Sequence, residues 1–106
     1  MNKTRLLEGM CVSNEPGYYK EGEFGIRIEN VMMCQRSPEP HMKETFYCWE
    51  NLTVAPYCRE LIDTNLLDEE TIAYINDFHQ KCLRILTPLL QGDNQDDKRA
   101  LAYVNK

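Results

Sequence analysis

Two glutamates near the start of the chain, Glu15 and Glu29, are the residues whose type and spacing could do chemistry. Each lies in a stretch predicted to be extended. Pro16 and Gly17 are expected to end the first stretch, and a loop rich in glycine and proline separates it from the second. In the second stretch Ile26 and Ile28 share one face, whereas Arg27 and Glu29 share the other. Two strands that meet across the intervening segment would therefore bring Glu15 and Glu29 to a common place.

The first stretch alternates in the same way, so that Cys11, Ser13 and Glu15 point to one face. Two carboxylates on one face repel each other unless a positive charge lies between them. Hard cations such as Mn²⁺ and Mg²⁺ take oxygen ligands, and a carboxylate can bridge two metals. The spacing equally allows a simpler interpretation, with both glutamates solvated at strand ends and Arg27 as a surface partner.

The amino-acid sequences of several segments resemble those of a known family. The two most specific are Asn-Glu-Pro-Gly-Tyr-Tyr at 14–19 and Phe-Gly-Ile-Arg-Ile-Glu-Asn at 24–30, and further likeness lies at 8–10, 50–56, 61–63 and 74–79. These segments resemble the C-terminal part of the Xaa-Pro aminopeptidases, which are metallopeptidases of the pita-bread fold. The resemblance implies that Glu15 and Glu29 are metal ligands, that Glu15 also shuttles a proton, and that Arg27 supports the site.

The same resemblance implies a parent enzyme that removes the N-terminal residue of peptides with proline in second position. Its dinuclear centre would most often hold manganese, with zinc or cobalt as alternatives. The family site takes two further Asp ligands and one His from upstream strands, so we expect residues 1–106 to be a partial catalytic domain that is inactive alone. A non-catalytic pita-bread domain that binds proteins, or another family member such as prolidase, remains an alternative.

Composition limits the other classes of function. The 106 residues carry a formal net charge of −5 and show no basic stripe, so we expect no nucleic-acid partner. No apolar run approaches the roughly 20 residues that span a membrane, and no signal peptide is visible. The five cysteines are odd in number and scattered, which favours a reducing, cytoplasmic location over a disulfide framework or a zinc ribbon.

The fold class expected is α+β, with antiparallel strands followed by helices. Strands are predicted within about 5–56, the last of them from about 45 and prolonged to Pro56, and a helical tail within about 68–106. Asp68 as the N-cap and the acidic residues after it predict a helix from about 69 to 87, which Pro88 is expected to kink or end near Thr87, and a short helix is predicted near 97–103. The apolar stripe predicted for the first helix consists of Ile72, Ile75, His79, Cys82, Leu83, Leu86 and Leu90.

Three side chains have simpler interpretations than a catalytic one. His79 lies on the apolar stripe and is expected to be packed and hydrogen-bonded. His41, in the proline-containing connection at 37–41, is expected to be solvated. Trp49 is interpreted as a core or interface residue, with a substrate platform as the alternative.

Strand edges and the face of Ile26 and Ile28 would be bare in this chain, so we also expect a homo-oligomer.

Overall fold

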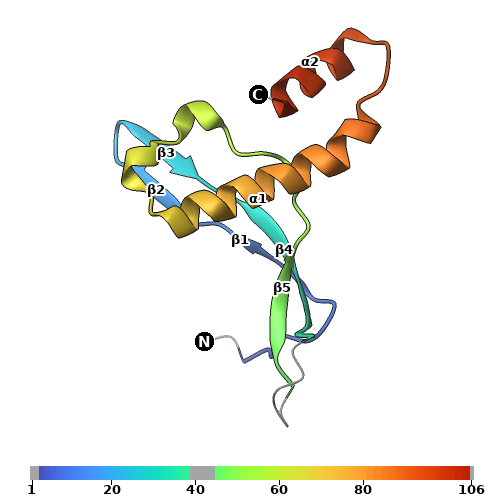
Figure 1. Ribbon diagram of the computed structural model, residues 1–106. Coiled ribbons are helices and arrows are strands. Elements are labelled where there is room, and N and C mark those ends of the chain that lie inside the picture. The colour runs from blue at the N-terminus through green and yellow to red at the C-terminus, as the bar shows by residue number, and fades with distance from the viewer. Residues whose placement is uncertain (1–2, 39–44, 106) are drawn as a thin grey trace. The chain divides into compact units, whose positions relative to one another are not determined.

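The computed structural model describes residues 3–38 and 45–105. Contacts within the chain divide it into two compact units, Met1–Thr53 and Val54–Lys106. The first unit holds the strands and the second the helices (Figure 1). The predicted order, antiparallel strands followed by a long helix and a short helix, is confirmed.

The first unit contains two antiparallel sheets. One has three strands in the order β1-β4-β5, and the other is a hairpin of β2 and β3. The strand bounds are β1 (Cys11–Asn14), β2 (Gly17–Lys20), β3 (Phe24–Arg27), β4 (Asn30–Arg36) and β5 (Tyr47–Asn51). The strands therefore occupy a narrower range than the predicted 5–56.

The two ladders follow one continuous register. Asn14 pairs with Asn30 at the end of the first ladder, and Gly17 pairs with Arg27 at the start of the second. The residues between them, Glu15-Pro16 and Ile28-Glu29, form the interruption. Pro16 has no N–H to donate to a ladder, although its carbonyl still accepts from the N–H of Ile28 at 3.0 Å.

This arrangement corrects one sequence-based expectation. Pro16 and Gly17 were expected to end the first extended segment and begin a loop, but the chain resumes pairing at Gly17 as β2. The ladder is interrupted over two residue pairs, 15/29 and 16/28, and the backbone does not turn away from it. The reversal comes later, at Gly22, whose φ of 72° lies in the left-handed region that glycine tolerates.

At the end of β5 a side-chain hydroxyl replaces a backbone carbonyl as hydrogen-bond acceptor. Beyond Asn51, the N–H of Leu52 still donates to the carbonyl of Val31 at 2.8 Å. The N–H of Val31 then donates to the hydroxyl of Thr53, also at 2.8 Å, so a side chain takes the place of the next backbone acceptor. The predicted extension of this strand to Pro56 is therefore wrong.

Burial in the first unit is concentrated on one face of β4, where Asn30 and Cys34 are buried. Ile26 and Ile28 are 44% and 50% exposed, so the face expected to meet a core is open in this chain. Trp49 is also exposed, which removes the core interpretation and leaves an interface or a substrate platform. The connection predicted at 37–41 is described only as far as Pro38, and His41 lies outside the described residues.

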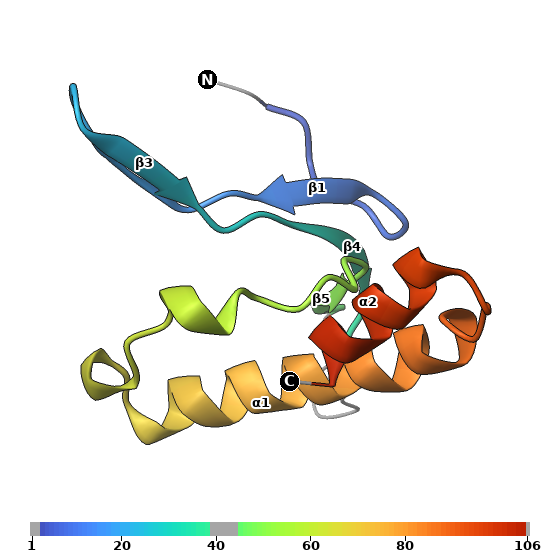
Figure 2. The same ribbon diagram turned by 90° about the horizontal axis from the view of Figure 1, so that it is seen from above.

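The second unit is built around α1 (Glu69–Leu86), with α2 (Gln95–Val104) folded back beside it (Figure 2). Asp68 caps α1 by accepting from the N–H of Thr71 at 2.8 Å, as predicted. At Pro88 the helix gives way to a 3-10 turn, η3 (Thr87–Leu89). Two further 3-10 turns precede α1, η1 (Arg59–Leu61) and η2 (Thr64–Leu66).

Two details of this unit differ from the sequence-based prediction. The second helix begins at Gln95 instead of near Asp97, because the side chain of Asn94 caps it by accepting from the N–H of Asp97. Phe78 was not assigned to the apolar stripe, yet it is buried and its ring lies 4.7 Å from that of Tyr57.

Within the described residues, no helix is both long and apolar enough to cross a membrane.

Candidate metal centre

The interruption between the two ladders carries the candidate site. The shared register places Glu15 opposite Glu29, one step beyond the Asn14–Asn30 pair. Alternation of side chains then puts both carboxylates on the face that Arg27 shares. The predicted convergence of the two glutamates follows from this geometry.

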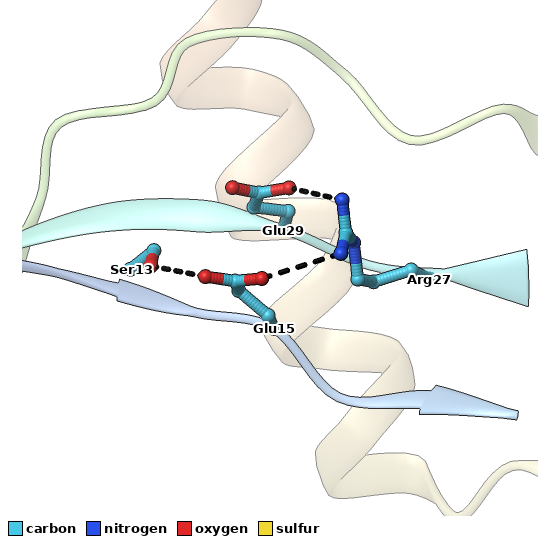
Figure 3. A network of polar contacts seen from close by, with 4 residues as sticks. All are labelled: Ser13, Glu15, Arg27 and Glu29. Atoms are coloured by element: carbon cyan, nitrogen blue, oxygen red, sulfur yellow. Dashed lines mark hydrogen bonds and ion pairs between the residues drawn. The ribbon is translucent and has the colours of Figure 1, made fainter.

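Arg27 contacts both carboxylates through separate nitrogens (Figure 3). Its Nη1 lies 3.3 Å from Oε2 of Glu15, and its Nη2 lies 3.1 Å from Oε2 of Glu29. The fork geometry of a guanidinium suits this double contact, because its N–H groups point in fixed directions. A positive charge thus stands between two carboxylates that would otherwise repel each other.

Ser13 extends the network on the other side of Glu15 (Figure 3). Its hydroxyl donates to Oε1 of Glu15, so the two oxygens of that carboxylate have different partners. The sequence placed Ser13 on the same face as Glu15 but gave it no part in the site. The available signal was a hydroxyl two residues away on one strand, which is too common a pattern to single out.

The network lies at the surface of the described chain. The side chains of Glu15, Glu29 and Arg27 are 41%, 45% and 49% exposed. Ion pairs in such surroundings contribute little to stability, about 0–1 kcal/mol each. The arrangement is therefore better explained as a set of oriented charges than as a structural clamp.

The donor set fits part of a divalent metal centre. Two facing carboxylates offer the oxygen atoms that hard cations prefer. A complete centre needs more ligands than two. Among the residues that the structure describes, no group of three or more His, Cys, Asp or Glu side chains could hold a metal ion.

The ring of Tyr19 covers two glycines of the β2–β3 hairpin beside the network. Tyr19 points to the same face as Arg27, and its ring lies over Gly17 and over Gly25, its cross-strand partner. A Cβ added to Gly25 would lie 2.7 Å from Cδ1 of Tyr19, so this glycine leaves room for the ring. Gly25 itself belongs to β3.

His79 lines a separate cavity of about 370 Å³ within the second unit, together with residues of segment 56–60, α1 and the end of α2. Its Nε2 accepts from the N–H of Tyr57 at 3.0 Å, which confirms the packed, hydrogen-bonded histidine that was expected. Burial, with a smaller contribution from the charge of Arg59, lowers the pKa of His79. The lowered pKa favours the neutral imidazole, which is the form that can accept this hydrogen bond.

Comparisons with known proteins cover both units. Residues 1–36 match metallopeptidase family M24, and residues 45–106 match the C-terminal region of peptidase M24. FRA1 of Saccharomyces cerevisiae, named as a candidate Xaa-Pro aminopeptidase, is 49% identical over 86 residues, which is 81% of this chain and 11% of that protein. Xaa-Pro aminopeptidase 1 of Dictyostelium discoideum is 40% identical over 88% of this chain and 15% of its own length.

A solved structure agrees with these matches. The crystal structure of X-prolyl aminopeptidase from Caenorhabditis elegans, described as a cytosolic enzyme with a dinuclear active site, has a TM-score of 0.78 and 29% identity. The likeness covers 95% of this chain and 17% of that one. The chain thus spans less than a fifth of the length of these relatives. It belongs to metallopeptidase family M24 and resembles its Xaa-Pro aminopeptidases in sequence and in pita-bread fold.

Proposed function

We propose that this chain is the C-terminal portion of a metal-dependent aminopeptidase that removes the N-terminal residue preceding proline. The observation that carries the proposal is the pair of facing carboxylates, Glu15 and Glu29, held on one face by the register of two ladders. The names of the relatives support the substrate class, a peptide with proline in second position.

Glu15 and Glu29 would hold a dinuclear centre, with manganese as the expected metal and zinc or cobalt as alternatives. Such a centre, when bound, supplies Lewis-acid activation of a peptide carbonyl and of a water molecule. Oxygen-only donation from this chain favours a hard ion such as Mn²⁺. The dinuclear active site described for the Caenorhabditis elegans enzyme supports the metal count.

Glu15 and Arg27 would have different roles in this reaction. Glu15 also accepts and returns a proton, as a carboxylate within hydrogen-bonding reach of the reacting water can do. Arg27 orients both carboxylates through its two nitrogens, so that neither swings away into solvent. The exposed position of all three side chains leaves them open to a substrate and to further ligands.

The location proposed for this protein is the cytoplasm. All five cysteines are free, which is the usual state in a reducing compartment. The Caenorhabditis elegans relative is described as cytosolic.

The experiment compares the 106-residue chain with the longest product of its gene, using a peptide with proline in second position and a matched peptide with alanine there. With Mn²⁺, we expect the longer product to cleave the proline peptide, and Glu15→Gln and Glu29→Gln to lose that cleavage. The 106-residue chain alone should be inactive and should bind Mn²⁺ weakly, since two carboxylates leave the ion mostly hydrated.

Each possible result has a definite meaning. Turnover by the short chain that disappears in Glu15→Ala would overturn its expected inactivity, and turnover that survives this substitution indicates a contaminating peptidase. A longer product that folds and binds Mn²⁺ but cleaves neither peptide would favour the alternative of a non-catalytic, protein-binding domain. Preference for a dipeptide over longer peptides would favour prolidase.

A further inference from the structure

We propose that Ser13 is a positioning residue that holds the carboxylate of Glu15 in the orientation needed for metal binding. The inference rests on the proposed function, because it gives Ser13 a task at the metal centre proposed above. It adds a residue that lies outside the pair of glutamates and their arginine. Its basis is the contact pattern in Figure 3, in which Ser13 and Arg27 both contact Glu15, whereas Glu29 contacts Arg27.

The two carboxylates are held differently. Glu15 accepts from the hydroxyl of Ser13 through Oε1 and contacts Arg27 through Oε2. Among the described residues, Glu29 makes its polar contact with Arg27 through Oε2. The plane of the Glu15 carboxylate is therefore defined by two partners, one at each oxygen, and a single partner defines that of Glu29.

The backbone explains why Glu15 needs a second partner. Glu15 lies just beyond β1, in the interruption of the ladder, and precedes Pro16, which cannot donate. A glutamate side chain also has high rotamer freedom, so its order depends on contacts at its tip. Ser13 is instead inside β1 and paired with Val31, so its short side chain starts from a fixed backbone.

The residue of β4 opposite Ser13 is held by hydrogen bonds on the side that faces away from β1. Val31 accepts from the N–H of Leu52 and donates to the hydroxyl of Thr53, both at 2.8 Å. Ser13 thus lies within the β1–β4 ladder, opposite a residue that is itself hydrogen-bonded to the segment 52–53, whereas Glu15 lies beyond the last pair of that ladder. A hydroxyl on a paired strand residue is a suitable anchor for a carboxylate at the interruption.

Two replacements of Ser13 by β-branched residues of similar shape differ in whether the side chain carries a hydroxyl. Ser13→Thr keeps the hydroxyl and Ser13→Val replaces it with a methyl group of nearly the same size, and both residues suit an exposed strand. In the metal-free 106-residue chain, side-chain scalar couplings of Glu15 report its rotamers. We expect one dominant rotamer in the wild type and in Ser13→Thr, and averaged couplings in Ser13→Val. Averaging in all three, or order retained in Ser13→Val, would overturn the proposal.

The second measurement is a Mn²⁺ titration of the same three proteins, followed by paramagnetic broadening of the Glu15 and Glu29 side-chain signals. Loss of a residue that orients a ligand weakens metal binding by roughly 10-fold or more. We therefore expect a dissociation constant raised by about that factor in Ser13→Val and nearly unchanged in Ser13→Thr. Equal affinities in the two variants would overturn the positioning role.

Failure of the proposed function looks different from failure of this inference. If the longest product of the gene neither binds Mn²⁺ nor cleaves the proline peptide, the metal centre itself is wrong, and the role of Ser13 falls with it. If Mn²⁺ does not broaden Glu15 and Glu29 in the wild-type 106-residue chain at millimolar concentration, the couplings of Glu15 in the metal-free chain decide the role of Ser13 by themselves. If the wild type shows the broadening and the two variants behave alike, the centre stands and Ser13 has no part in it.

Discussion

Arg27 stands between two carboxylates that face each other across an interrupted ladder, and this arrangement can be tested by removing its charge. Like charges directly opposite on neighbouring strands are destabilising. We expect Arg27→Gln to lower the free energy of unfolding of the metal-free chain at low salt. The expected loss is small, roughly 0.5–1 kcal/mol, because the three side chains are nearly half exposed and water screens their charges. Thermal melts at low and high salt measure it.

Salt and a second substitution provide the controls for this prediction. The loss should shrink at 0.5 M salt, since screening acts over a few ångströms there. Adding Glu29→Gln to Arg27→Gln should recover part of the stability, because one carboxylate then no longer faces another. Lys20→Gln breaks an exposed pair with Glu23 in the same hairpin and serves as the matched control. An identical loss in both single variants would show that the opposed carboxylates contribute nothing particular.

At the scale of elements, the N-terminus of α1 depends on the side chain of Asp68. Hydrogen bonds from the side chain and backbone N–H of Thr71 lower the pKa of Asp68 below its ordinary value of 3.8. A carboxyl with a lowered pKa stabilises the fold above its unfolded pKa, and that stabilisation is lost as pH falls through the folded pKa. We expect Asp68→Ala to lower the melting temperature at pH 7 and to have less effect near pH 2, measured by circular dichroism.

Asp68→Asn is the matched variant for this prediction. Asparagine keeps an oxygen that can accept from the N–H of Thr71 but does not titrate. Its melting temperature should therefore lie between those of the wild type and Asp68→Ala at pH 7. Wild type and Asp68→Asn should converge at low pH. Equal losses in the two variants at pH 7 would show that the capping oxygen is not what matters.

His79 should give the second unit a different pH dependence. Its folded pKa is lowered, so below the unfolded value of about 6.5 the unfolded chain takes up a proton that the folded chain does not. The contribution to stability is therefore full above about pH 6.5 and declines as pH falls through the lowered pKa. Protonation also removes the acceptor for the N–H of Tyr57. We expect the melting temperature to fall between pH 7.5 and pH 5.

His79→Gln isolates this effect, because glutamine can accept a hydrogen bond but does not titrate. The slope of melting temperature against pH between 5 and 7.5 should be smaller in this variant than in the wild type. Arg59→Gln removes the minor cause of the lowered pKa and should reduce the slope only slightly. A slope unchanged in His79→Gln would assign the pH dependence to other groups.

Local rules predicted the elements well where one residue type decides the outcome. Asp68 begins a helix and Pro88 ends one, because a capping oxygen and a missing N–H act within a single turn. The interruption at Pro16 was misjudged because its effect depends on the opposite strand. Whether a proline ends a strand or only interrupts its pairing is set by cross-strand register, which one strand alone does not reveal.

At the scale of the whole molecule, the sequence predicted the site as a pair but not as a network. Alternation predicted that Glu15 and Glu29 share a face, because the period of a strand is two. The separate partners of each oxygen, and the ring of Tyr19 over two glycines, depend on side-chain rotamers. The remaining ligands implied by the family resemblance do not appear as a cluster among the described residues.

The last prediction concerns an exposed apolar face of the hairpin. Tyr18, Phe24, Ile26 and Ile28 are between 44% and 58% exposed and share the face opposite to the carboxylates. In the three-stranded sheet, β1 and β5 are edge strands. A bare apolar face with strand edges tends to recruit another chain, and a second copy is the partner present in a pure sample. We therefore expect self-association, seen in light scattering as a mass that rises above 12.5 kDa with concentration.

A charged residue on this face should weaken that association. Ile26→Lys places a charge among the apolar side chains, and lysine is a residue that natural sheets use to discourage pairing between chains. Leu66→Lys is the control, since Leu66 is 82% exposed and lies in the second unit. The mass should approach that of a monomer in Ile26→Lys and follow the wild type in Leu66→Lys. A wild-type mass that stays near 12.5 kDa at millimolar concentration would show that the hairpin face does not drive association.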